Sequence, residues 1–125
     1  MGTAYIGGVK YKDRVCVVKI KNKFIADSTP EICIALREYS KKKGIKAIVL
    51  DLNEIENIDT TAFACLISMV KNYLNNLPNI GIISLKSKTK GLAEILKISN
   101  VIKIFNNEKE ALDFFNKDRK NKGIK

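Results

Sequence analysis

Histidine and tryptophan are absent from this chain of 125 residues, and proline occurs only twice. The lack of histidine removes the Ser-His and Cys-His nucleophile pairs, the usual zinc ligand and the commonest general base. Carboxylates are the remaining candidates for catalysis, but acidic side chains in a loop are ordinarily solvated groups. The cluster in question is Asp51, Glu54, Glu56 and Asp59. We therefore expect a protein without enzymatic activity, bound metal or cofactor.

Cysteine is also scarce, and its three positions match neither a metal-binding nor a redox spacing. Cys16, Cys33 and Cys65 each have apolar neighbours, which predicts buried free thiols in a reducing compartment. No apolar run approaches the ~18 to 20 residues that span a bilayer, and the N-terminus lacks the basic-then-apolar pattern of a secretory signal. We expect a cytoplasmic protein that has no contact with a membrane.

Positive charge is abundant, with a formal net charge of +10 at pH 7, but it comes almost entirely from lysine. The arginines are Arg14, Arg37 and Arg119, and arginine is the residue favoured for bidentate contacts with phosphates and bases. The lysines are scattered, apart from the tail and Lys41–Lys43, which end a predicted helix where cations suit the dipole. A nucleic-acid-binding face is one interpretation of this charge. We favour a solvated surface and expect no nucleic-acid partner.

Hydrophobic residues make up 46% of the chain, which is enough for the core of one domain. Residues 1–117 are predicted to form that domain, which is long enough to fold as a monomer. Residues 118–125 are predicted to be a charged, disordered tail.

Strand-like runs and helical apolar spacing alternate along the chain in the order β-β-α-β-α-β-α-β-α. The predicted strands are Ala4–Lys10, Arg14–Ile20, Ala47–Leu50, Ile80–Leu85 and Val101–Phe105. The predicted helices are one from Ser28–Glu31 to Gly44, then Ala62–Leu74, Lys88–Lys97 and Glu108–Asn116. Such alternation is typical of a layered α/β domain with a mostly parallel sheet, to which the first two strands add a hairpin at one edge.

A short polar segment joins the third predicted strand to the second predicted helix, and its sequence is Ile58-Asp59-Thr60-Thr61-Ala62. Two hydroxyl groups therefore lie where a helix begins, beside unpaired backbone N–H groups and the positive end of the macrodipole. One interpretation is that Asp59 or Thr60 is simply the N-cap of that helix. The other is that Thr60 or Thr61 carries a phosphate, which the same physical environment would accommodate.

Three segments of the chain carry a resemblance to a known family. The run Ile48–Leu52, followed by Ile58–Phe63, is similar to a strand, a loop and an Asp-Ser/Thr-x-Gly-Leu helix start. Leu96–Phe105 is similar to a Leu-x-x-Ser/Thr-Gly-Leu-x-x-x-Phe segment, and Asn107–Leu112 to a closing helix. In this order and spacing, over about residues 5–116, they resemble the STAS domain, the family of sulfate-transporter domains and anti-sigma factor antagonists.

The resemblance implies an α/β STAS fold with a mixed, mostly parallel sheet of four to five strands and about four helices. It also implies partner switching, in which the antagonist binds an anti-sigma factor that is a serine/threonine kinase of the GHKL type and so frees a sigma factor. The kinase phosphorylates the hydroxyl that follows the motif aspartate, which is Thr60 here, with Thr61 as the second choice. A phosphatase of the PP2C type reverses the modification. Partner contacts are expected from Asp59, Thr60, Thr61, Ala62, Phe63 and Asp27.

The chain departs from the family pattern at several positions. The glycine of the helix start is Ala62, and the usual leucine is Phe63. The Gly-x-Leu-Asp stretch that many antagonists carry corresponds to Asn22–Ile25, so its acid is missing and Asp27 is the nearest replacement. Members that serve as a subunit of another assembly, such as an ABC lipid-transport complex bound to its ATPase, also use an Asp-Thr helix start. That role is the alternative function.

Overall fold

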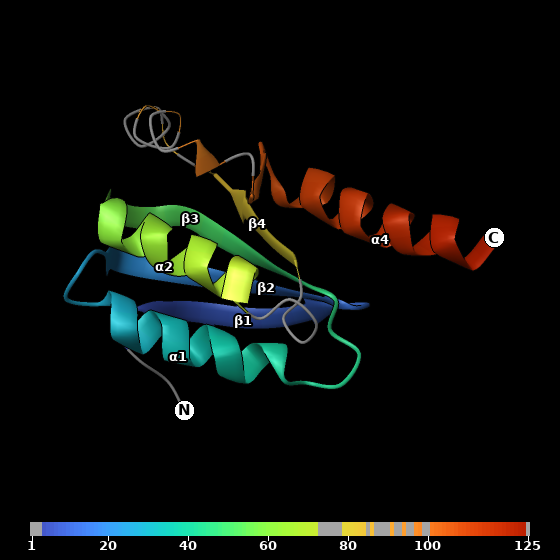
Figure 1. Ribbon diagram of the computed structural model, residues 1–125, viewed down its shortest axis with the longest axis horizontal. Coiled ribbons are helices and arrows are strands. Elements are labelled where there is room, and N and C mark those ends of the chain that lie inside the picture. Colours follow the sequence, from blue (N-terminus) through green and yellow to red (C-terminus); the bar gives the residue numbers. More distant parts are fainter. Residues whose placement is uncertain are drawn as a thin grey trace.

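The computed structural model describes residues 4–72, 79–84, 86, 91, 94, 97, 98 and 101–124. Within them the elements are β1 (Ile6–Lys12), β2 (Val15–Phe24), α1 (Thr29–Ser40), β3 (Ala47–Ile58), α2 (Thr60–Asn72), β4 (Asn79–Ile83), β5 (Lys103–Phe105) and α4 (Glu108–Ile124). The strands form one sheet in the order β1-β2-β3-β4-β5, in which β1 is antiparallel to β2 and the other neighbours are parallel (Figure 1). The predicted mixed, mostly parallel α/β sheet is confirmed.

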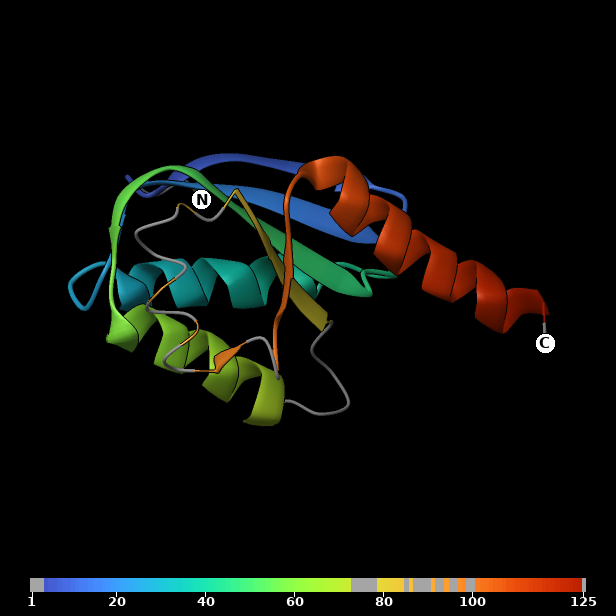
Figure 2. The same cartoon turned by 90° about the horizontal axis from the view of Figure 1, so that it is seen from above.

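The sheet separates two hydrophobic cores because alternate residues of each strand point to opposite faces. The larger core lies between the sheet and the helices α1 and α2, and it includes Val18, Ile20, Leu36, Leu50, Phe63 and Leu66. The smaller core lies on the other face, and it consists of Val15, Val17, Ala47, Val49, Ile83, Ala111 and Phe115. Figure 2 shows α1 and α2 on one side of the sheet and α4 on the other. The parallel strands are therefore covered on both faces, as their continuous apolar runs indicate.

The second and third strands are longer than the sequence predicts. The predicted strands end at Ile20 and Leu50, but β2 continues to Phe24 and β3 continues to Ile58. The two strands pair along this extension, with Phe24 opposite Ile58, after shifts of register between Lys19 and Lys21 and again beyond Asn22. Because an irregular strand loses the strict alternation of apolar and polar residues, the periodicity of the sequence hides it.

The last helix also extends beyond its predicted end. It continues to Ile124, whereas the sequence predicts that this helix ends at Asn116. Lysine and arginine are good helix formers and no proline interrupts this stretch, so the backbone can stay helical without an apolar stripe. The helix predicted over Lys88–Lys97 lies largely outside the described residues, as does the Ser99-Asn100 pair.

The prediction of three free thiols is wrong for two of the cysteines. Cys33 of α1 and Cys65 of α2 form a disulfide, with 7.3 Å between their Cα atoms, whereas Cys16 is free and buried. The two positions are 32 residues apart in sequence, and they meet because both helices pack on the same face of the sheet. The spacing of the cysteines in the sequence does not predict this pairing.

Candidate functional site

The start of α2 is built on Asp59, the residue that follows β3. One carboxylate oxygen, Oδ1, accepts a hydrogen bond from the backbone N–H of Ala62 at 3.1 Å, and the backbone carbonyl of Asp59 accepts one from Phe63 at 3.3 Å. This is the geometry of an N-cap, in which a side chain satisfies one of the donors that the first turn leaves unpaired. The prediction that a helix begins at this point is confirmed, and Asp59 is its cap.

The second oxygen of the same carboxylate holds the loop between β2 and α1. Asp59 Oδ2 accepts a hydrogen bond from the backbone N–H of Ala26 at 3.0 Å, and the N–H of Asp59 donates to the carbonyl of Phe24 at 3.3 Å. Loop and helix start are thus tied together by one side chain. They lie beyond the carboxyl ends of the parallel strands β2 and β3, the edge where open α/β sheets bind their ligands.

The loop is fixed from within by two hydroxyl groups. Ser28, which is fully buried, accepts a hydrogen bond at Oγ from the N–H of Ile25 at 3.1 Å and donates to the carbonyl of Lys23 at 2.9 Å. Thr29 donates from Oγ1 to the carbonyl of Ile25 at 2.8 Å. Both residues belong to the predicted helix start, Ser28–Glu31. Ser28 does occupy the N-cap position of α1, but its side chain bonds backward to the loop and makes no cap bond.

The site residues predicted from sequence divide into an exposed and a buried group. Thr60 and Thr61 are exposed on the first turn of α2, and Asp27 is exposed on the neighbouring loop. Ala62 and Phe63, also expected among the partner contacts, are fully buried in the larger core. They anchor the helix start from beneath, because the third and fourth residues of α2 turn toward the sheet.

Asn22 takes the backbone conformation that the family pattern reserves for glycine. Its φ angle is +69°, in the left-handed region that glycine and asparagine tolerate best. The side chain also donates from Nδ2 to the carbonyl of Ala4 at 2.8 Å, which ties this bend to the start of the chain. Asparagine is therefore compatible with the left-handed backbone at this irregular point of β2.

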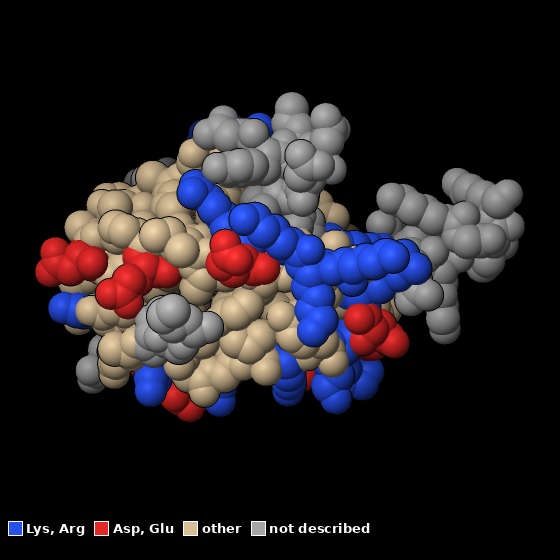
Figure 3. All heavy atoms as spheres, turned by 90° about the horizontal axis from the view of Figure 1, so that it is seen from below, with Lys and Arg blue, Asp and Glu red and all other residues tan. Residues whose placement is uncertain are grey.

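Charge is unevenly distributed along the side of the molecule where α1 lies. Figure 3 shows acidic side chains toward the end where α1 begins and a band of basic side chains toward the end where α1 finishes. The acidic residues there include Asp27 and Glu31, and the basic ones include Lys41, Lys42 and Lys43. Thr60 thus lies at the acidic end of the molecule, beside Asp59 and near the loop that carries Asp27.

A model of the STAS domain family matches residues 9–111. The chain belongs to the STAS domain family. No curated protein matches it. This STAS domain is similar in structure to an anti-sigma factor antagonist from Mycobacterium paratuberculosis, at 16% identity and a TM-score of 0.71 over 83% of this chain and 87% of that one.

Two further solved structures share the fold of this STAS domain. Unphosphorylated SpoIIAA is 7% identical with a TM-score of 0.70, over 87% of this chain and 95% of that one. A sulfate transporter family protein from Wolinella succinogenes is 13% identical with a TM-score of 0.63, over 80% and 83% of the two chains. The shared feature at these identities is the fold.

The described residues contain neither a group of potential metal ligands nor a helix that could span a membrane. There, no group of three or more cysteine, aspartate or glutamate side chains is placed to hold a metal ion. None of the helices in the same part of the chain combines the length and apolar character needed to cross a bilayer. What the site offers is an exposed hydroxyl pair on a firmly capped helix start.

Proposed function

We propose that this STAS domain is an anti-sigma factor antagonist and that Thr60 is its phosphorylation switch. Its partners are a serine/threonine kinase of the GHKL type, which is also the anti-sigma factor, and a phosphatase of the PP2C type. The proposed role is binding, with no catalysis by the chain itself. The single observation that carries the proposal is the exposed Thr60 directly after the capping Asp59.

The helix start can carry a phosphate without loss of the fold. Thr60 is the first residue of α2, where backbone N–H groups and the macrodipole favour negative charge. Its exposure leaves room for the phosphate and for a kinase to reach the hydroxyl. Phosphorylation can therefore act at the surface alone, without rearranging the domain.

The same charge would act strongly inside a complex. A phosphate that becomes buried and unpaired in an interface costs about 2 to 5 kcal/mol, the range measured for unpaired interfacial charges. Since about 1.4 kcal/mol corresponds to a tenfold change in affinity, the complex would weaken by roughly 30-fold to several thousand-fold. A change of that size is sufficient to exchange one partner for another.

Affinity capture with four forms of the chain tests the proposal. Wild type and Thr60→Ala should retain the same GHKL-type kinase, identified by mass spectrometry, and Thr60→Glu should lose it. Thr61→Glu, with the same added charge one position along the helix, tests the second-choice position. The purified kinase with ATP should add one phosphate to wild type and none to Thr60→Ala.

Two results would reject the switch at Thr60. One is equal recovery of a kinase by wild type, Thr60→Ala and Thr60→Glu. The other is recovery of an ABC ATPase by all three forms, which would favour the role of a subunit in a transport complex.

A further inference from the structure

The first strand forms an open edge of the sheet. β1 stands at one end of the strand order, and every residue from Gly7 to Lys12 is exposed. In the described part of the chain β2 is its one neighbour. Such an edge presents a row of N–H and C=O groups on its outer side, which can pair with another extended segment.

The side chains of β1 alternate between two chemical types. Val9 and Tyr11 are opposite Val18 and Cys16 of β2, so they lie on the face that carries α1 and α2. They remain 36% and 38% exposed. The Lys42 ammonium lies 4.3 Å from the centroid of the Tyr11 ring, so one face of that ring is already in contact with a cation. A segment that pairs with this edge would place every second side chain beside Val9 and the remaining exposed part of Tyr11.

The opposite face of the same strand is basic. Lys10 and Lys12 are opposite Val17 and Val15, which point to the face that carries α4. Lys10 forms an ion pair with Glu108 at 2.9 Å, and half of its side chain stays exposed. The remaining side chains of an added strand would lie beside these lysines.

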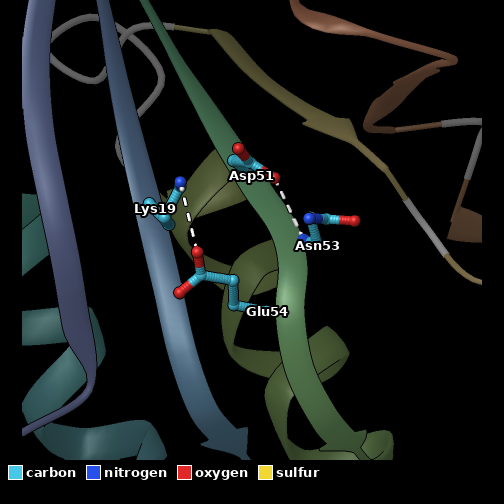
Figure 4. Close-up of polar contacts among 4 residues, drawn as sticks. All are labelled: Lys19, Asp51, Asn53 and Glu54. Carbon is cyan, nitrogen blue, oxygen red and sulfur yellow. Dashed lines mark hydrogen bonds and ion pairs between the residues drawn. The ribbon is translucent and has the colours of Figure 1, made fainter.

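A hollow lies next to β1 on this basic face. Its volume is about 310 Å³, and its lining includes Gly8, Lys10, Lys19, Asp51 and Glu108. The site of a Cβ atom on Gly8 has no neighbour within 4 Å, so the space above this glycine is open. Figure 4 shows Lys19 directed to Glu54, at 3.3 Å, while Asp51 accepts a hydrogen bond from the N–H of Asn53 at 3.0 Å. The hollow is thus lined by charged groups of both signs. A side chain of the added strand can enter it over Gly8, which has no side chain to block the way.

We propose that the free edge of β1 binds an extended segment of a partner protein in which acidic and apolar residues alternate. Acidic side chains would lie beside Lys10 and Lys12, apolar ones beside Val9 and Tyr11, and the backbone would extend the sheet. A second copy of this chain fits less well, because two β1 strands would gather the lysines of both copies on one face. The surface uses none of the residues of the Thr60 site.

Fluorescence anisotropy with a labelled peptide tests the proposal on the full chain. The probe alternates glutamate and valine over about nine residues, a usual strand length. One control peptide has the same composition in two blocks, and another has lysine in place of glutamate. The alternating acidic peptide should bind at least about tenfold more tightly than either control, since a tenfold change needs only about 1.4 kcal/mol.

Variants locate the binding surface on the chain. The double variant Lys10→Glu with Lys12→Glu should weaken binding about tenfold or more. Lys71→Glu with Lys103→Glu is matched in charge, lies on α2 and on β5 at the other end of the strand order, and should bind as wild type does. Gly8→Val, which has open space for its side chain, should weaken binding without unfolding the domain, and hydrogen exchange at β1 amides should slow when peptide binds.

Three outcomes would overturn the proposal. Equal binding of the alternating and block peptides would indicate charge attraction without strand pairing. Displacement of the peptide by duplex DNA at physiological salt would indicate a nucleic-acid surface. A dimer of the free chain in analytical ultracentrifugation that Gly8→Val disrupts would mean that a second copy occupies the edge.

Discussion

We expect Asp59 to contribute more to the free energy of unfolding than an ordinary helix cap. Its two carboxylate oxygens accept hydrogen bonds from two segments, the start of α2 and the loop between β2 and α1. Loss of an N-cap costs about 0.5 to 2 kcal/mol. Loss of a hydrogen bond to a charged group costs about 1.5 to 3 kcal/mol when buried, and less here because Ala26 is exposed and water can replace the bond. We expect Asp59→Ala to lower the free energy of unfolding by about 2 to 3 kcal/mol, or roughly 10 °C in melting temperature.

The substitution Asp59→Asn separates the two bonds. Asparagine caps helices well and keeps one acceptor oxygen, so the bond to Ala62 can remain while the one to Ala26 is lost. Urea unfolding followed by circular dichroism should place Asp59→Asn between wild type and Asp59→Ala. Hydrogen exchange at the Ala26 amide should be faster in both variants.

A matched control is available on the neighbouring loop. Asp27 is exposed, so Asp27→Ala should change the free energy of unfolding by less than about 0.5 kcal/mol. If Asp59→Ala proves as mild as Asp27→Ala, the carboxylate does not hold the loop against the helix, and the argument for a rigid surface around Thr60 fails.

Three further predictions concern the core and its thiols. Reduction of the Cys33–Cys65 disulfide, or Cys65→Ser, should lower the free energy of unfolding by about 3 to 4 kcal/mol, because the bond closes a loop with a sequence separation of 32. Urea unfolding with and without dithiothreitol measures this difference. Equal midpoints would contradict it. Gly81→Ala should lower the free energy of unfolding by about 1 to 3 kcal/mol, because the added Cβ would lie 3.0 Å from the ring of Phe105 and 3.1 Å from that of Phe115. An unchanged thermal midpoint would refute this close approach. Burial raises the pKa of the Cys16 thiol above its ordinary value of 9.0, so the thiol ionises more readily in the unfolded chain. Its contribution to the free energy of unfolding is therefore fully present below pH 9 and is lost as the pH rises further. Urea midpoints between pH 8 and 11 should therefore fall less steeply in Cys16→Ala than in wild type, and parallel curves would argue against a buried thiol.

The sequence by itself determined the fold class and the position of the site. Apolar runs at Ala47–Leu50 and Ile80–Leu85 are too continuous for half-exposed strands, which required a sheet covered on both faces. The step from a strand run to helical spacing at Asp59 located the helix start, because capping chemistry is local and depends on neighbouring residues alone.

Tertiary structure decided the features that depend on distant residues meeting. The disulfide forms because α1 and α2 pack side by side. The hydrogen bond from the N–H of Ala26 to Asp59 forms because β2 and β3 end at the same edge of the sheet. Burial of Ala62 and Phe63 depends on which side of α2 turns toward the sheet. Periodicity and capping act over a few residues, whereas these contacts join segments that are 32 to 33 residues apart, and only the packed sheet brings them together.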